Sequence, residues 1–148
     1  MTNPSYFLCV AGIISFAIAL LHIVIIAAGP KAYDYFGAGE DLVLMARRGS
    51  VIPPLLTIFI ALVFAVFGLY AFSAADLYRD LPFKGPLVVI IGILYFLRGS
   101  AVFFQLLNRG SSASGTREII FSLISFTAGI CYLAGVLGNW ESITGGPL

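Results

Sequence analysis

Apolar residues gather into four long runs along the chain, 6–28, 53–75, 85–107 and 118–137, separated by shorter polar segments. A helix needs about 20 residues, at about 1.5 Å each, to cross a hydrocarbon core of about 30 Å, and each run reaches that length. Backbone polar groups in lipid have to be bonded within the protein, so runs this long predict helices and not open strands. The pattern therefore predicts an all-α membrane protein, with residues 1–148 forming a single transmembrane domain built as an antiparallel four-helix bundle.

Proline and glycine residues stand at the ends of these runs. Gly29 and Pro30 follow the first run, and Pro53 and Pro54 open the second. Proline in the first turn of a helix costs no hydrogen bond, because the N–H that it lacks has no partner there. Inside the second run, alanines recur four residues apart, a spacing that predicts close helix packing through small side chains: Ala61 with Ala65 and Ala71 with Ala75.

The segment between the first two runs carries the signals of a further helix over residues 40–48. Glu40 and Asp41 suit the positive N-terminal end of a helix dipole, and Arg47 and Arg48 suit its negative C-terminal end. Glycines on both sides are typical of helix boundaries. A helix this short cannot cross a bilayer, so it is expected either to lie amphipathically in the interface or to re-enter the bundle.

Lysine and arginine in the connections predict the orientation of the spans. The first and third connections hold Lys31, Arg47, Arg48, Arg109 and Arg117, whereas the second holds only Arg79 and Lys84. Positively charged loops resist translocation, so the first and third connections are expected in the cytoplasm and both termini outside. The expected location is the cytoplasmic (inner) membrane of a bacterium.

The composition agrees with a lipid environment. Hydrophobic residues make up 60% of the 148 residues and charged residues 10%, and the mean hydropathy is +1.04. The formal net charge of +1 supplies no basic surface for nucleic acid, so no nucleic-acid partner is expected. Membrane lipid is the first expected partner, and a second copy of the chain, as a homo-oligomer, or other membrane subunits are further candidates.

No motif points to a bound cofactor or metal ion, and none is expected. His22 is the single histidine, which excludes a bis-histidine haem site within one chain. Cys9 and Cys131 stand alone in separate apolar runs, which is typical of small buried hydrophobic side chains. The sequence lacks H-E-x-x-H, Walker A, G-x-S-x-G and dinucleotide-binding motifs.

Arg98 is the residue that costs most to place in lipid. It lies near the middle of the third run, where insertion scales assign a charged side chain a cost of about 2.5–3.5 kcal/mol. Tyr95 and Gln105 share its helical stripe and are expected to flank it on an inward face. A buried guanidinium needs acceptors. Two interpretations follow: a ligand site, and a structural ion pair that sets the helix register.

Other polar residues fall in the same half of the membrane as Arg98: His22, Glu40, Thr57, Gln105 and Glu118. This common depth predicts a polar pocket that opens toward the first and third connections, with Glu40 or Glu118 as the counter-ion of Arg98. The alternative for His22 is a hydrogen-bonded packing role.

The fourth run carries its own polar stripe, which comprises Glu118, Ser122, Ser125, Gly129 and Tyr132. This face is expected to contact protein, with the two serines serving as helix-packing residues.

Three functions fit these patterns. The first is a protein that binds or moves a small anionic or polar ligand at an intramembrane site of Arg98 and His22, with Tyr95 and Gln105 beside them. The second is a non-catalytic accessory or assembly subunit of a membrane complex. The third is a membrane enzyme that acts on a lipid-like substrate, with His22 and either Glu40 or Glu118 as acid and base.

Overall fold

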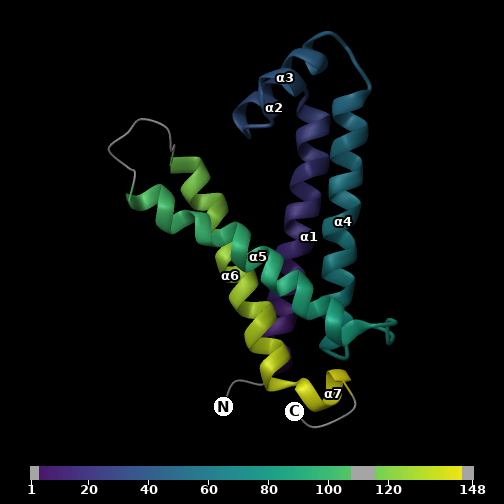
Figure 1. Ribbon diagram of the computed structural model, residues 1–148. Coiled ribbons are helices and arrows are strands. Elements are labelled where there is room, and N and C mark those ends of the chain that lie inside the picture. Colours follow the sequence, from purple (N-terminus) through teal and green to yellow (C-terminus); the bar gives the residue numbers. More distant parts are fainter. Residues whose placement is uncertain (1–3, 108–115, 145–148) are drawn as a thin grey trace. The chain divides into compact units, whose positions relative to one another are not determined.

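The computed structural model describes residues 4–107 and 116–144 (Figure 1). Within these residues the secondary structure is helical, and no strand is present. The helices follow in the order α1 (Pro4–Ala28), α2 (Pro30–Tyr35), α3 (Glu40–Arg47), α4 (Ile52–Ala74), α5 (Lys84–Leu107), α6 (Thr116–Gly138) and α7 (Trp140–Thr144).

Four of the described helices are long and apolar enough to cross a membrane. The qualifying segments are Ser5–Ala28, Ile52–Ala74, Lys84–Phe104 and Thr116–Gly138. Each long helix begins and ends within two residues of the run that predicts it. The prediction of four apolar spans in an all-helical chain is therefore confirmed, and the four helices indicate an integral membrane protein.

The chain divides into two compact units, which are described separately. The α5–α6 unit comprises Met1–Ile14 and Phe67–Leu148, and the α2–α3 unit comprises Ser15–Val66. Each unit contains part of α1 and part of α4, because the divisions fall inside these two helices. That residues 1–148 form a single transmembrane domain stays a prediction.

In the α5–α6 unit, helices α5 and α6 lie directly against one another (Figure 1). A Cβ atom added to Gly99 would lie 2.2 Å from the backbone nitrogen of Phe126, and one added to Gly129 would lie 2.5 Å from that of Phe96. These distances leave no room for any side chain, so the two backbones touch. Packing through small residues is typical of helix pairs in lipid, where apolar burial alone does not hold helices together.

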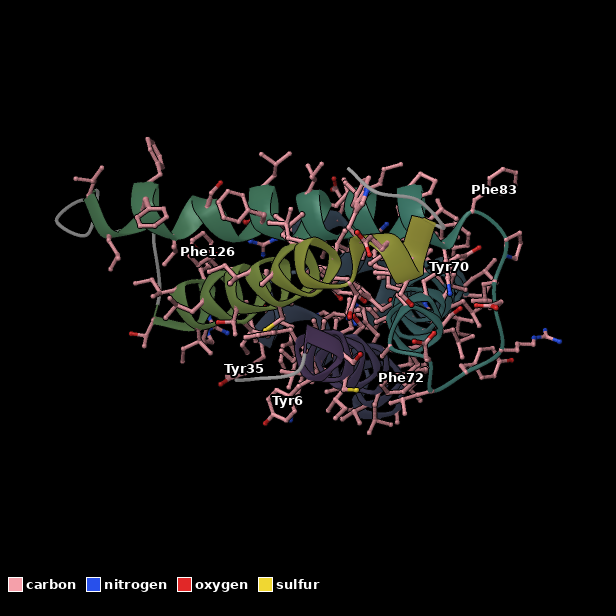
Figure 2. All side chains as sticks on the ribbon, turned by 90° about the horizontal axis from the view of Figure 1, so that it is seen from below. Tyr6, Tyr35, Tyr70, Phe72, Phe83 and Phe126 are labelled. Carbon is pink, nitrogen blue, oxygen red and sulfur yellow. The ribbon has the colours of Figure 1, made fainter. Side chains whose placement is uncertain are left out.

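Small residues lie at the helix contacts of this structure, and they include glycines besides the alanines that the sequence predicts. Ala61, Ala71 and Ala75 are buried, in agreement with a packing role for small residues of the second run. The backbone contacts, however, occur at glycines of α5 and α6. Beside them, the ring of Phe126, labelled in Figure 2, packs against Phe96 and Phe103 at centroid distances of 5.1 and 5.4 Å.

The connection between α4 and α5 is held by side chains near the end of α4. The Ser73 hydroxyl donates to the carbonyl of Arg79 (2.9 Å) and accepts from the N–H of Leu81 (3.0 Å). The hydroxyl of Tyr70, labelled in Figure 2, donates to the carbonyl of Pro82 at 3.2 Å. These bonds satisfy backbone groups that the turn leaves without helical partners, so the turn between the two spans is well defined.

The α2–α3 unit contains two short helices that pack together (Figure 1). Helix α3 confirms the predicted helix between the first two spans. Helix α2 was not predicted, because Gly29 and Pro30 mark the end of the first run; in the structure Gly29 adopts φ 75° and Pro30 starts a new helix. Proline suits the first position of a helix as well as it suits a stop, so sequence alone did not separate the two roles.

An apolar cluster joins the short helices to the end of α1. Its buried members are Ile25, Ala32, Tyr33 and Val43. On the surface, Arg47 of α3 pairs with Asp34 of α2 at 3.2 Å, but both side chains are exposed and the pair contributes little. Burial of the apolar cluster is therefore the main interaction that positions α3.

We expect Gly99→Ala to lower the stability of the detergent-purified protein by about 1–3 kcal/mol, because the new Cβ overlaps the Phe126 backbone and forces α5 and α6 apart. The matched control is Gly138→Ala at the exposed end of α6, which should change stability by less than about 0.5 kcal/mol. Thermal unfolding followed by circular dichroism measures both. Equal melting temperatures for the two variants would contradict the close contact.

Candidate functional site

Arg98 lies well inside α5. At about 1.5 Å per residue it is about 14 Å along the helix axis from Leu107, the last residue of α5. Helical side chains lean toward the N-terminus of their own helix, which here is the more distant end. A fully extended arginine side chain is shorter than this distance, so the guanidinium needs acceptors supplied at depth.

The guanidinium finds one acceptor on the neighbouring helix. Its Nη1 donates to the Ser122 hydroxyl of α6 at 3.3 Å, and Ser122 has 0% of its surface exposed. Phe96 of α5 lies against Gly129 of α6, and Gly99 of α5 lies against Phe126 of α6. At this contact, residue numbers therefore rise along α5 as they fall along α6. Ser122 therefore lies closer than Arg98 to the C-terminal end of α5. To reach Ser122, the Arg98 side chain extends toward that end, opposite to the direction in which helical side chains normally lean.

The carboxylate expected beside Arg98 does not come from Glu118. Within the described part of the α5–α6 unit, no carboxylate oxygen lies within 4.0 Å of the guanidinium. Glu118 is exposed, one turn before Ser122 on α6. Glu40 is exposed in the first turn of α3 and belongs to the other unit, so its pairing with Arg98 stays a prediction.

Tyr95 lies one turn from Arg98 but packs into an aromatic cluster. Its ring stacks on Tyr132 with centroids 5.6 Å apart and meets Phe67 edge to face at 6.0 Å. The Tyr132 hydroxyl donates to the carbonyl of Phe67 at 2.8 Å. Tyr132 was predicted only as part of the protein-facing stripe of the fourth run, and its bond to α4 could not be foreseen, because the partner lies 65 residues earlier.

The predicted stripe of α6 is buried in all but one position. Ser122, Ser125, Gly129 and Tyr132 are buried, which confirms that this face contacts protein. Glu118 alone is exposed. Gln105 belongs to α5, but its side chain lies outside the described part of the chain.

His22 is held by its own helix. Its Nδ1 lies 2.7 Å from the carbonyl oxygen of Ile18, one turn earlier. A carbonyl oxygen cannot donate, so Nδ1 carries a hydrogen, and of the two neutral tautomers only the one with a bare Nε2 fits this bond. The ring packs on Phe64 of α4 with centroids 5.3 Å apart.

In the α2–α3 unit, His22 and Thr57 contact different parts of α4. Thr57 is buried, and its hydroxyl donates to the carbonyl of Pro53 in its own helix at 2.8 Å. Phe64, the residue under the His22 ring, is about two turns along α4 from Thr57. His22 of α1 therefore contacts α4 about two turns away from Thr57.

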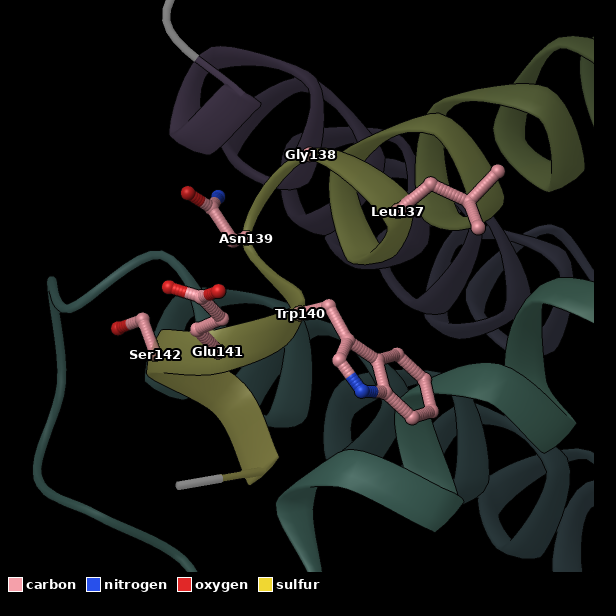
Figure 3. A pocket seen from close by; sticks show the side chains of 6 residues that line it. All are labelled: Leu137, Gly138, Asn139, Trp140, Glu141 and Ser142. Carbon is pink, nitrogen blue, oxygen red and sulfur yellow. The ribbon is translucent and has the colours of Figure 1, made fainter. Parts of the chain in front are cut away.

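Among the described residues, no group of three or more histidine, cysteine, aspartate or glutamate side chains could hold a metal ion. A hollow lies where α6 meets α7, lined by Leu137, Gly138, Asn139, Trp140, Glu141 and Ser142 (Figure 3). Its members are exposed or half-buried. The hollow therefore lacks the buried polar side chains that would fix a ligand.

The pair formed by Arg98 and Ser122 has the chemistry of an oxyanion site. A guanidinium carries five N–H donors in a planar fork that matches carboxylate and phosphate oxygens. Ser122 is fully buried, and its hydroxyl accepts from Nη1 and so holds the guanidinium in place. The exposed Arg98 side chain is therefore the group that can contact an anion.

We expect nitrogen-15 NMR of histidine-labelled protein to find His22 with a protonated Nδ1 and a bare Nε2, because only Nδ1 faces the Ile18 carbonyl. Most exposed neutral histidines favour the opposite tautomer, so the result is diagnostic. A protonated Nε2 with a bare Nδ1 would contradict the hydrogen bond to α1.

The chain was compared with known families, sequences and structures. No family model, curated protein or solved structure matches it. A functional proposal therefore has to come from the chemistry of the residues described above.

Proposed function

We propose that the protein binds or moves a small anionic or polar ligand in the membrane, with Arg98 as the residue that holds it. The observation that carries the proposal is the pairing of a mid-span guanidinium with a neutral hydroxyl. Within the described part of its unit, Arg98 donates to Ser122 and contacts no carboxylate. Its positive charge is therefore not neutralised there, and an anionic ligand can supply the missing charge.

The energies support a ligand over a structural role for Arg98. A charged side chain at mid-span costs about 2.5–3.5 kcal/mol, and one hydrogen bond to a charged group returns about 1.5–3 kcal/mol. The bond to Ser122 at best roughly cancels the cost, so Arg98 contributes no clear stability to the fold. Contributions from His22, Thr57 and Glu40, which lie in the other unit, stay predictions.

The proposal includes an antiparallel four-helix bundle in the bacterial inner membrane with both termini outside. The contacts of Gly99 with Phe126 and of Gly129 with Phe96 support the antiparallel arrangement of α5 and α6. The orientation rests on the excess of lysine and arginine in the first and third connections. Arg109, one member of that count, lies outside the described residues.

A non-catalytic accessory or assembly subunit is the second candidate. His22 and Thr57 bond to carbonyls of their own helices, as side chains with a packing role do. Such contacts support a polar interior that serves only helix pairing.

A membrane enzyme has weaker support. Within the described part of the α2–α3 unit, His22 has no carboxylate partner for acid–base chemistry.

We expect Arg98→Met to keep the thermal stability of the wild type within about 1 kcal/mol, because the lost hydrogen bond and the relieved cost of the charge offset one another. Binding of small anions, followed as ligand-induced thermal shifts in detergent, should be lost. The double variant Arg98→Met with Glu118→Gln should be no more stable than the single variant. If Arg98→Met lowered the free energy of unfolding by about 3–5 kcal/mol and the added Glu118→Gln change restored it, the result would instead identify a buried ion pair.

We expect single cysteines placed at either terminus, in a variant with Cys9 and Cys131 replaced by alanine, to react with an impermeant maleimide in intact cells. A cysteine replacing Val51, which is 75% exposed in the first connection, should react only after the cells are opened. The reverse pattern would overturn the proposed orientation.

A further inference from the structure

We propose that the ligand of Arg98 is the phosphodiester headgroup of a membrane lipid, which reaches the guanidinium from the bilayer; the inference rests on the proposed anion site. It follows from where Arg98 and Ser122 lie on the helix pair and from the charges around them.

The Arg98 guanidinium is accessible from outside the pair of helices. Ser122 has 0% of its surface exposed, whereas the Arg98 side chain is exposed, so the guanidinium lies at the edge of the α5–α6 contact and not inside it. Its neighbours on α5, Leu94 and Leu97, are 50% and 61% exposed, and Leu123 beside Ser122 is 47% exposed. Branched apolar side chains around an accessible cation fit the acyl chains and the phosphate of one lipid molecule.

The depth of Arg98 along the helix pair decides how far a lipid phosphate has to move to reach it. The Arg98 side chain extends toward Ser122, which is about 9 Å along α6 from its first residue, Thr116. An arginine below the interface draws phosphates and water inward and thins the bilayer locally. Because the guanidinium already points toward the nearer interface, a lipid phosphate has to descend by only about two helical turns to meet it.

The charges around Arg98 favour a singly charged ligand. Arg98 offers one positive charge, and Glu118 places a negative charge one turn beyond Ser122. A phosphodiester carries one negative charge and is matched by one guanidinium, whereas free phosphate carries up to two at neutral pH and is repelled more strongly by Glu118. Arg98 can bind two phosphate oxygens with its fork, while the buried Ser122 hydroxyl accepts from Nη1 and holds the guanidinium in place.

The test is native mass spectrometry of the full-length protein in mild detergent, titrated with phosphatidylglycerol. The comparison lipid is a phosphate-free glycolipid with the same acyl chains. Arg98→Gln should weaken phosphatidylglycerol binding about tenfold to hundredfold, as expected for loss of a charge-assisted hydrogen bond, and should leave glycolipid binding unchanged. Ser122→Ala should weaken it about two- to tenfold.

Two further variants complete the test. Arg79→Gln, in the connection between α4 and α5, is the matched control and should bind phosphatidylglycerol like the wild type. Arg98→Lys keeps the charge but not the fork, so it should recover part of the affinity and show that the loss in Arg98→Gln is not misfolding.

Two results overturn the inference in different ways. If Arg98→Gln binds phosphatidylglycerol as tightly as the wild type, but inorganic phosphate still raises the melting temperature only when Arg98 is present, the lipid assignment fails and the anion site stands. If neither probe depends on Arg98, both the lipid assignment and the proposed function fail.

Discussion

Direct backbone contact between α5 and α6 is the constraint on which the α5–α6 unit depends. Gly99 and Gly129 allow it, because any Cβ at either position would overlap backbone atoms of the partner helix. Lipid offers helices no gain from burying apolar surface, so van der Waals contact and interhelical hydrogen bonds have to hold them together. The short separation brings Ser122 within hydrogen-bond distance of Arg98, and Tyr95 of α5 into stacking contact with Tyr132 of α6.

The polar groups of the spans are satisfied in two ways, and the difference separates packing from candidate function. His22 and Thr57 bond to carbonyls one turn away in their own helices, so each makes a hydrogen bond without a partner from another helix. Arg98 and Tyr132 bond to other helices instead. For Tyr132 the bond closes a buried cluster, whereas for Arg98 it leaves a charge that a hydroxyl cannot neutralise. Arg98 is therefore the residue whose chemistry is least explained by folding.

The α2–α3 unit is held by a different balance of forces. Its short helices are too short to be stable alone, and their ion pair between Arg47 and Asp34 is exposed. The buried cluster around Tyr33 and Val43 supplies the stabilisation. Gly37 and Gly39 have positive φ and let the chain turn sharply between α2 and α3, a conformation that other residues adopt at a cost.

Sequence alone determined the four spans and α3, because span length, apolar composition and dipole-matched charges are local properties of the chain. It also determined which face of α6 is buried, since the small and hydroxyl residues there share one stripe. Only the tertiary structure decided the partners of that face: Ser122 and not Glu118 for Arg98, and the Phe67 carbonyl for Tyr132. Helix propensity and periodicity carry no information about which residue of another helix lies within 3–4 Å, because that distance depends on how closely two backbones pack, which here two glycines decide.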